Sequence, residues 1–259
     1  MPVVHFVPFS SLVQPTLWHE LTRLKLEVLR LSDETVPLTA TYSAGRTIKD
    51  RNTGQEVALG CMITAGGDGF DKDHALPPQA VAAYGVLKNY NTIDEFKNAD
   101  KKALLNQVAD EIWESITTKR DTSALTRFLV ITYADLKKYK YYYWFAFPAL
   151  VAQPLWEIAD EWKLASEAFS EAQLSSIHDQ FNAQPRAFFL VRPAQTGTGV
   201  DLAPVEDYTS FFANISPEAR TVAFLDPSPD AQVPGWPLRN LLAYLRAVHP
   251  SETDTIRVI

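Results

Sequence analysis

The sequence is poor in the residues that build disulfides and metal centres. Cys61 is its only cysteine among 259 residues, which excludes an internal disulfide framework and indicates a reducing compartment. The five histidines show no i,i+4 pair and no other metal-binding spacing, so a zinc site is not expected. We therefore expect neither a metal nor another cofactor.

Long apolar runs and an excess of positive charge are also missing. No run is long enough to span a bilayer, and the opening residues MPVVHFVPFSS lack the basic start and apolar stretch of a signal peptide. The net charge of -7 argues against nucleic acid or anionic lipid as the main partner. Repeats and low-complexity segments are absent as well. These features predict a cytoplasmic globular protein that does not bind membranes directly.

An aromatic stretch from Phe128 to Pro148 dominates what is present. Residues 128–133 and 139–147 have the β-branched and aromatic composition of strands, and the polar residues 134–138 suit a reversal, so we predict a β-hairpin. Rings fall on both faces of the second strand. This pattern indicates either a central strand with helices on both sides or a strand that serves a partner. Three neighbouring lysines support the second interpretation.

Hydrophobic periodicity and capping residues predict the other elements of the first 165 residues. A capping box at Thr92 and Glu95 begins a long helical region, and Asn52-Thr53-Gly54 has the chemistry of a turn between two strands. The remaining expectations are a strand over residues 3–7, a helix capped by Thr16 that extends to residue 31, strands over 37–42 and 55–63 that pair as a second hairpin, a restart of the helical region at residue 98 or 100, and an irregular segment over 152–166.

The last third of the chain alternates single strands with loops and helices. Ser170 and Gln173 form a second capping box. Strands are expected over 187–191, 221–225 and 255–259, and the helix that begins at Pro237 makes the last two strands part of a right-handed βαβ unit. The predicted fold class is α/β with mixed α+β character, in two subdomains at 1–165 and 166–259. Because the chain ends on an apolar strand, we expect it to be a piece of a longer protein.

No constellation for covalent or phosphate chemistry stands out. Cys61 lies in an expected strand without an adjacent base, so we predict a buried structural thiol. The glycine-rich segment 65–78 lacks the Gly-Lys-Ser/Thr sequence of a phosphate-binding loop.

The loop from Pro234 to Asn240 is the most conspicuous candidate binding site. Two prolines and a glycine fix its backbone around Trp236 and Arg239, beyond the end of a strand and at the start of a helix. Three interpretations follow. The loop holds a partner, or it docks Trp236 into its own core, or residues 226–236 form the small-molecule site of an enzyme domain.

Several motifs, in the same order along the whole chain, resemble those of one protein family. They are FVPFSS at 6–11, WHEL at 18–21, DKK at 100–102, EIWESI at 111–116, ADLKKY at 134–139, YYWF at 142–145 and PGWPLRN at 234–240. By these motifs the chain resembles the N-terminal domain of the autophagy ubiquitin-like-modifier-activating enzyme. In that family the adenylation site, the zinc-binding cysteines and the catalytic cysteine lie in a C-terminal domain that has no counterpart here.

The resemblance implies a non-catalytic, monomeric recruitment domain, whereas the full-length enzyme is homodimeric through its C-terminal domain. It implies that the domain binds the autophagy conjugating enzymes, so that an activated ubiquitin-like modifier is passed to them, within a protein transport pathway. The family's early Phe-Ala-Pro motif is Phe6-Val7-Pro8 here, and the bulkier valine is a departure. We expect no catalytic residue and no metal ligand, and the following partner-binding residues: Phe6, Pro8, Phe9, Lys137, Lys138, Lys140, Pro234, Trp236, Pro237, Arg239 and Asn240.

Overall fold

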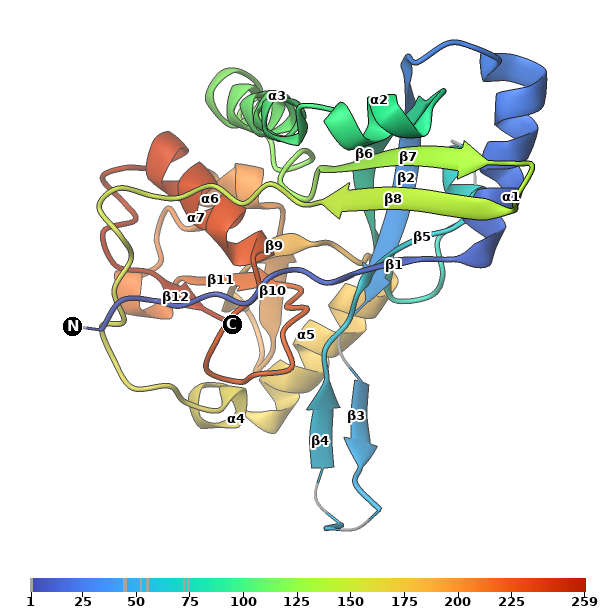
Figure 1. Cartoon of the computed structure of the whole chain (residues 1–259). Coiled ribbons are helices and arrows are strands. Elements are labelled where there is room, and N and C mark those ends of the chain that lie inside the picture. The colour runs from blue at the N-terminus through green and yellow to red at the C-terminus, as the bar shows by residue number, and fades with distance from the viewer. Residues whose placement is uncertain (1, 44–45, 52, 55, 72, 74) are drawn as a thin grey trace.

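The described part of the protein contains two β-sheets, a separate two-stranded ribbon and the helices that pack around them (Figure 1). The computed structural model describes residues 2–43, 46–51, 53–54, 56–71, 73 and 75–259, without the side chains of 46–48 and 56–58. The strands are β1 Ser11–Val13, β2 Thr35–Ser43, β3 Arg46–Lys49, β4 Glu56–Leu59, β5 Ile63–Ala65, β6 Ala80–Tyr90, β7 Phe128–Asp135, β8 Lys140–Ala146, β9 Phe188–Pro193, β10 Val200–Ala203, β11 Thr221–Phe224 and β12 Arg257–Val258. The α-helices are α1 Pro15–Leu24, α2 Ile93–Asn98, α3 Lys101–Glu114, α4 Ala165–Ala168, α5 Glu171–Ala183, α6 Tyr208–Phe211 and α7 Pro237–Val248. The predicted α/β class with mixed α+β character is confirmed.

The larger sheet has the strand order β1-β5-β2-β6-β7-β8. Strand β6, which the sequence analysis did not identify, pairs antiparallel with β2 and parallel with β7. Alternate residues of β7 face opposite layers: Phe128 and Val130 belong to the cluster that also contains the leucines of α1, whereas Leu129 and Ile131 pack against α2 and α3. The sheet is therefore covered by α1 on one face and by α2 and α3 on the other.

The predicted aromatic hairpin is confirmed as β7 and β8, but β8 is not a central strand. It pairs antiparallel with β7, with Ile131 opposite Trp144, and it is the last strand of the sheet. Helices nevertheless cover both of its faces. Trp18 of α1 stacks on Tyr141 with ring centroids 5.0 Å apart, while Phe96 of α2 lies 6.4 Å from Tyr142 on the opposite face. The rings on two faces therefore reflect two helical layers, and one edge of the strand meets no other strand of the described chain.

Three expectations near the amino terminus are wrong. The segment Val3–Val7 is extended but makes only isolated bridges, from Val3 to Glu157 and from Val7 to Gly235, because no neighbouring strand continues the pairing. Helix α1 is capped by Gln14, with Pro15 at its first position, so Thr16 is already inside the helix. After Leu24 the chain forms one π-turn, Lys25–Leu29, which is followed by an exposed Leu31.

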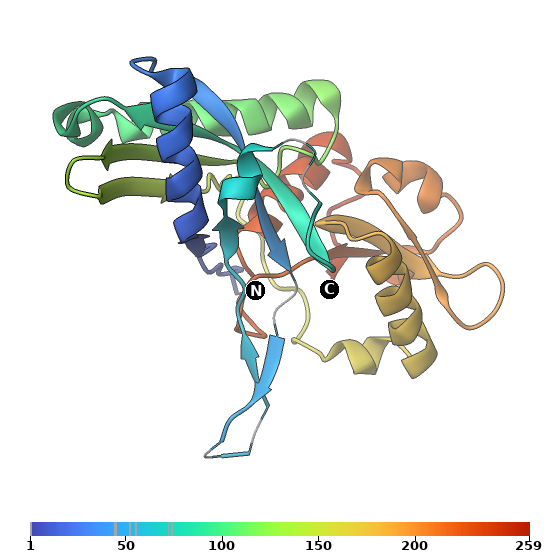
Figure 2. The same ribbon diagram turned by 90° about the vertical axis from the view of Figure 1, so that its right-hand side faces the viewer.

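The second predicted hairpin is also different. The region 55–63 divides into β4, which pairs with β3 and not with β2, and Ile63, the first residue of β5. Strand β2 pairs along its length with β6, and its Thr41 pairs with Thr64 of β5, so of β4 and β5 only β5 meets β2. The turn at Gly54 instead joins β3 and β4, which form the ribbon that projects from the body (Figure 2). Asn52 and Gln55 lie outside the described residues.

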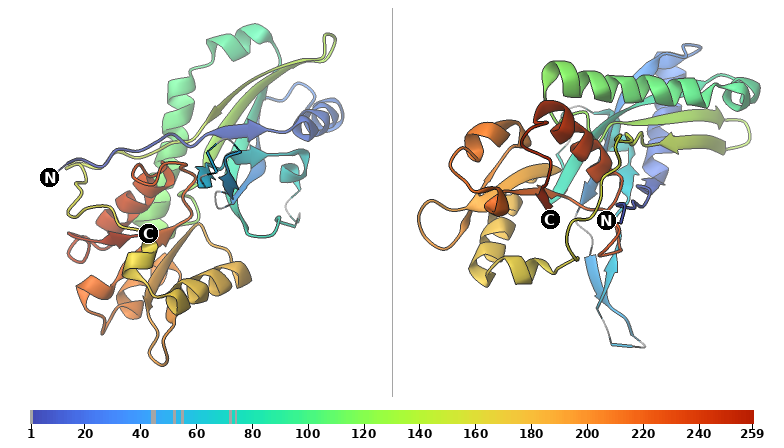
Figure 3. Two further views of the ribbon diagram at one scale, coloured as in Figure 1. Left: turned by 90° about the horizontal axis from the view of Figure 1, so that it is seen from below. Right: turned by 90° about the vertical axis from the view of Figure 1, so that its left-hand side faces the viewer.

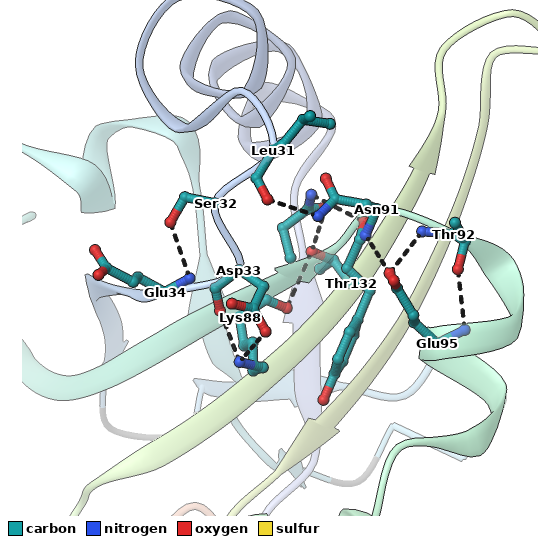
Figure 4. Close-up of polar contacts among 11 residues, drawn as sticks. Leu31, Ser32, Asp33, Glu34, Lys88, Asn91, Thr92, Glu95 and Thr132 are labelled. Atoms are coloured by element: carbon teal, nitrogen blue, oxygen red, sulfur yellow. Dashed lines mark hydrogen bonds and ion pairs between the residues drawn. The ribbon is translucent and has the colours of Figure 1, made fainter.

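The junction between β6 and α2 confirms the predicted capping box (Figure 4). Thr92 Oγ1 accepts a hydrogen bond from Glu95 N at 3.1 Å, and Glu95 Oε2 accepts one from Thr92 N at 3.0 Å. The Asn91 side chain donates to Leu31 O at 2.8 Å, which ties the segment after α1 to this junction. Asp100 is the N-cap residue of α3, so the helical region restarts at residue 100, one of the two predicted positions.

The smaller sheet, with the order β10-β9-β11-β12, confirms the βαβ unit. Strands β11 and β12 are parallel and α7 connects them, with Pro237 at its first position. Helix α5, which begins at the predicted Ser170 capping box, packs on one face of this sheet, and α7 packs on the other (Figure 2). We propose the boundary at 165/166, which falls inside α4, as a division between the larger sheet and the smaller one. The two parts share a core, because Ile112 and Ile116 of the first part pack with the leucines of α7 in one buried cluster.

The Asn240 side chain joins the two parts. It is fully buried, its Nδ2 donates to Leu125 O at 2.7 Å and to Pro148 O at 3.0 Å, and its Oδ1 accepts from Leu150 N at 2.8 Å. All three backbone groups precede residue 165, whereas Asn240 lies on α7. A single amide therefore fixes α7 against the segment that leaves β8.

Replacing Asn240 should lower stability sharply. Asn240→Ala leaves three backbone groups without their partner, so we expect a loss of about 3 kcal/mol or more in the free energy of unfolding. Asn240→Asp removes both donors and buries a charge, so at pH 7 it should destabilise further. Urea unfolding checks this, with Asn98→Ala on exposed α2 as the control, expected within about 0.5 kcal/mol of the parent chain. An Asn240→Ala midpoint equal to that of the control would show that the amide is dispensable.

Candidate functional site

The structure brings two of the three predicted groups of partner-binding residues together. The extended segment at Val7 pairs with the loop at Pro234 and Trp236: Val7 N donates to Pro234 O at 2.9 Å, and Trp236 N donates to Val7 O at 3.0 Å. One turn into α7, the Arg239 guanidinium lies 5.8 Å from the centre of the Phe6 ring. Segments more than 220 residues apart in sequence thus form one surface (Figure 3).

An open pocket of about 210 Å³ lies beside this junction. We call it the Phe6 pocket, and its lining residues are Val3, Val4, His5, Phe6, Leu150, Val151, Ala152, Leu155, Trp156, Arg239 and Leu242. Most of these side chains are apolar. The residues from Leu150 to Trp156 were not among the predicted site residues, because this irregular segment has no hydrophobic period. Their one signal in the sequence is a group of apolar residues in a loop, which is typical of a contact surface.

Arg239 supplies the positive charge of the pocket. Its Nε donates to Leu150 O at 3.0 Å, and among the described residues no carboxylate forms an ion pair with it. Burial without an opposite charge lowers the pKa of the Arg239 guanidinium, although arginine stays charged at neutral pH. A half-buried, unpaired guanidinium in an apolar setting favours the arrival of a carboxylate.

Trp156 also lines the pocket. Its indole Nε1 is buried without a hydrogen-bond partner in the described protein, and the Arg246 guanidinium lies 4.1 Å from its ring centre. A mostly apolar pocket with the Arg239 guanidinium in its lining can hold an apolar side chain that is followed closely by an oxygen acceptor. These are groups that a peptide segment carries.

Four of the predicted site residues have a structural position instead. Phe9, Pro234, Pro237 and Asn240 are buried, so they have almost no surface to offer a partner. Trp236, which the sequence suggests is exposed, is half-buried and packs against the core cluster of the larger sheet. Pro8 is exposed, and Phe6 and Arg239 are half-buried.

The three lysines form the third group and lie elsewhere. Lys137, Lys138 and Lys140 are exposed at the tip of the β7–β8 hairpin, where Lys138 Nζ is 3.7 Å from Asp135 Oδ2. Their tip and the Phe6 pocket lie toward opposite ends of β8, because the chain leaves β8 and reaches Leu150 at the pocket (Figure 1). The seven residues of β8 span about 23 Å at the usual rise per residue.

The loop from Asp226 to Trp236 packs against the segment that precedes β5. Cys61 N donates to Pro227 O at 3.1 Å, and a Cβ at Gly60 would lie 2.9 Å from the same oxygen. The described protein has another pocket between β6 and α3. No residue of the Asp226 to Trp236 loop lines that pocket or the Phe6 pocket. No helix in the described ranges has the length and apolarity to cross a membrane, and no group of three acidic, histidine or cysteine residues there has the geometry of a metal site.

The chain matches the family model described as the N-terminus of ubiquitin-like modifier-activating enzyme ATG7 over residues 4–259. ATG7 of Cryptococcus neoformans is 37% identical over 255 residues, which are 96% of this chain and 37% of that protein. The human ATG7 enzyme is 32% identical over 266 residues, which are 99% of this chain and 36% of that protein. The chain thus spans little more than a third of the length of these curated relatives.

Two solved structures share the fold. The crystal structure of Kluyveromyces marxianus Atg7NTD superposes with a TM-score of 0.63 and 24% identity over 94% of this chain and 81% of that chain. The structure of the Kluyveromyces marxianus Atg7NTD-Atg10 complex gives a TM-score of 0.66 and 24% identity over 100% of this chain and 82% of that chain.

Cys61 lies between β4 and β5 and is half-buried, so the expectation of a buried thiol within a strand is wrong on both points. It should still be an unreactive thiol, because partial burial disfavours the thiolate. Burial raises the pKa of Cys61 to about 11, so the thiol stays protonated at neutral pH and only its small thiolate fraction reacts. The rate of alkylation by iodoacetamide should therefore rise about tenfold per pH unit from pH 7 to pH 10, where an ordinary cysteine with a pKa near 8.5 has already reached its plateau. We also expect no thioester between Cys61 and a ubiquitin-like protein. A plateau below pH 9 would contradict the burial argument.

The buried charge of Asp226 should destabilise the folded protein, whereas the hydrogen bonds that its side-chain oxygen accepts should stabilise it. Its Oδ1 accepts hydrogen bonds from Ser228 N at 2.9 Å and Gly235 N at 3.0 Å, while burial raises its pKa above the ordinary value. A raised pKa in the folded state means that the stability of the protonated form is lost as the pH rises through that value.

Asp226→Asn keeps an oxygen for both bonds and removes the charge. At pH 7 we expect it to be as stable as the parent chain or more stable, with a difference that shrinks below about pH 4. Asp226→Ala should cost about 1–3 kcal/mol, because both N–H groups lose their acceptor. Urea unfolding at pH 7 and pH 3.5 separates the two effects. If Asp226→Asn is the less stable chain at pH 7, the buried charge is favourable and our account is wrong.

Proposed function

The chain belongs to the ATG7 N-terminal family, and we propose that it recruits autophagy conjugating enzymes, so that an activated ubiquitin-like modifier can be passed to them. The activation chemistry is assigned to the remainder of the full-length enzyme, which this proposal also takes to be a cytoplasmic homodimer that serves protein transport in autophagy. The present chain is proposed to act as a monomeric docking module that does not bind membranes directly.

The Kluyveromyces marxianus complex supports this proposal, because an Atg7 N-terminal domain with the same fold is there bound to Atg10. The observation on this chain that carries the proposal is the half-buried Arg239 without a carboxylate partner, beside an apolar pocket. Arginine and aromatic side chains at the centre of a partly dry pocket are typical of interface hot spots. We assign the Phe6 pocket as one contact surface for a conjugating enzyme, with Phe6, Pro8 and Arg239 as its residues from the predicted site.

The valine of Phe6-Val7-Pro8 fits this assignment. Both hydrogen bonds of Val7 use its backbone, to Pro234 and Trp236, so the segment is held by groups that every residue except proline carries. A larger side chain at this position therefore leaves the placement of Phe6 over the pocket intact.

Arg239→Glu tests the assignment. We expect it to weaken binding of an Atg10-type conjugating enzyme from the same organism by at least about 30-fold, because a repulsive charge replaces a hot-spot cation. Its loss of the charged bond to Leu150 O should cost about 1.5–3 kcal/mol in stability, so the variant stays folded. The dissociation constant and the melting temperature are measured for each variant by calorimetry.

Lys102→Glu is the matched control, because it makes the same change of charge on the exposed surface of α3. It should leave the affinity within about twofold, since single exposed charges contribute little. Arg239→Lys keeps the charge without the planar fork and should recover part of the affinity. If Arg239→Glu and Lys102→Glu bind equally well, the pocket is not a contact surface. If the parent chain binds no conjugating enzyme at all, the recruitment function is wrong.

A further inference from the structure

The outer edge of β8 is free along its whole length. All pairing of β8 is with β7, from Asp135 opposite Lys140 to Leu129 opposite Ala146, and β8 ends the strand order of its sheet. Among the described residues no other backbone group bonds to residues 140–146. Because successive residues of a strand direct their N–H and C=O groups to opposite edges, alternate residues of β8 present unpaired groups to solvent.

The strand is held rigid although its edge is open. On one face, Trp18 lies 5.0 Å from Tyr141 and 5.5 Å from Tyr143, and Thr22 Oγ1 is 3.3 Å from Tyr141 Oη. On the other face, Tyr142 lies beside Phe96 of α2. The hairpin is thus clamped between two helical layers (Figure 3). Because β8 is already ordered, a partner strand that binds to it causes little further loss of conformational entropy in this chain. The exposed parts of Tyr142 (40%) and Tyr143 (49%) offer side-chain contacts beside the backbone hydrogen bonds.

The positive charge at the start of the β8 edge favours one kind of partner strand. Lys137, Lys138 and Lys140 stand at the start of this edge, on a chain whose net charge is -7. Lysines at a sheet edge disfavour pairing between identical strands, and two copies of an acidic chain repel each other. An acidic segment is attracted by the same lysines. At the other end of β8, the chain runs on to the Phe6 pocket, where the Arg239 guanidinium bonds to Leu150 O but to no described carboxylate. Both ends of the edge therefore favour an acidic peptide.

We propose that an extended, acidic segment of the recruited conjugating enzyme adds to β8 as a seventh strand of the larger sheet, with its carboxylates beside Lys137, Lys138 and Lys140. The identity of the protein that carries the segment rests on the proposed recruitment function. Backbone hydrogen bonds supply the pairing, and the lysines and tyrosines select the sequence of the segment.

Amide hydrogen exchange tests this pairing directly. The chain is measured alone and with a saturating amount of an Atg10-type conjugating enzyme, and in parallel with the enzyme of the lipid-linked modifier. We expect exchange within residues 140–146 to slow by at least about tenfold in one of the complexes, because outward N–H groups gain acceptors. The amides of α5, which packs on the smaller sheet, are the internal control and should not change.

Proline substitutions give a second readout with a matched control. Of Tyr142→Pro and Tyr143→Pro, one removes a bond to β7 and weakens the hairpin, and the other removes only an outward donor, which an edge strand tolerates. The variant that keeps the parent melting temperature should bind about 3- to 10-fold more weakly than the alanine variant at the same position, which retains its N–H.

The outcomes separate this inference from the proposed function. A complex in which residues 140–146 exchange as fast as in the free chain overturns the strand pairing and leaves recruitment intact. The absence of any complex overturns recruitment and, with it, this inference. Protection of residues 140–146 that grows with the concentration of the chain alone shows that a second copy occupies the edge, which also overturns the proposal.

Discussion

The buried Asn240 amide is the constraint on which the candidate site depends. Its Oδ1 accepts from Leu150 N, and the next residue back on α7, Arg239, donates to Leu150 O. Two successive residues of one helix therefore hold both polar groups of Leu150, at the point where the chain leaves β8 and enters the Phe6 pocket. The pocket is rigid because this contact is made inside the protein, where water does not compete with the amide.

The same constraint explains how an edge strand can carry many rings without losing order. The end of β8 is anchored through Pro148 and Leu150 by Asn240, and its rings are packed by Trp18 and Phe96. Its outer edge, the tip and parts of Tyr142 and Tyr143 remain in contact with solvent. An exposed aromatic edge is an aggregation hazard unless charge or a partner covers it. The lysines of the tip supply that charge in the free chain.

Local chemistry was sufficient to predict the elements whose signals are local. The capping boxes at Thr92 and Ser170, the hairpin and the βαβ unit are confirmed, because each depends on residues close in sequence. Strand β6 was missed because its run Ala-Val-Ala-Ala-Tyr-Gly has small residues and weak alternation, although Gly85 is needed where the Phe128 ring lies 2.6 Å from a Cβ position. The position of β8 at the edge, and the meeting of Phe6 with Arg239, depend on tertiary packing that no local pattern encodes.

If the chain recruits a conjugating enzyme as proposed, one end of β8 affects the association rate and the other end affects the dissociation rate. Exposed lysines at the tip act at a distance and are screened by salt, so they affect how fast an acidic segment arrives. Arg239 acts only after its pocket is filled, and a charge paired there is shielded from water, so it affects how slowly the partner leaves. A segment that engages both ends along one rigid strand gains from their fixed separation, because the second contact forms within the complex and not from free solution. Two modest surfaces can therefore give a specific complex whose association depends on salt and whose lifetime depends on the pocket.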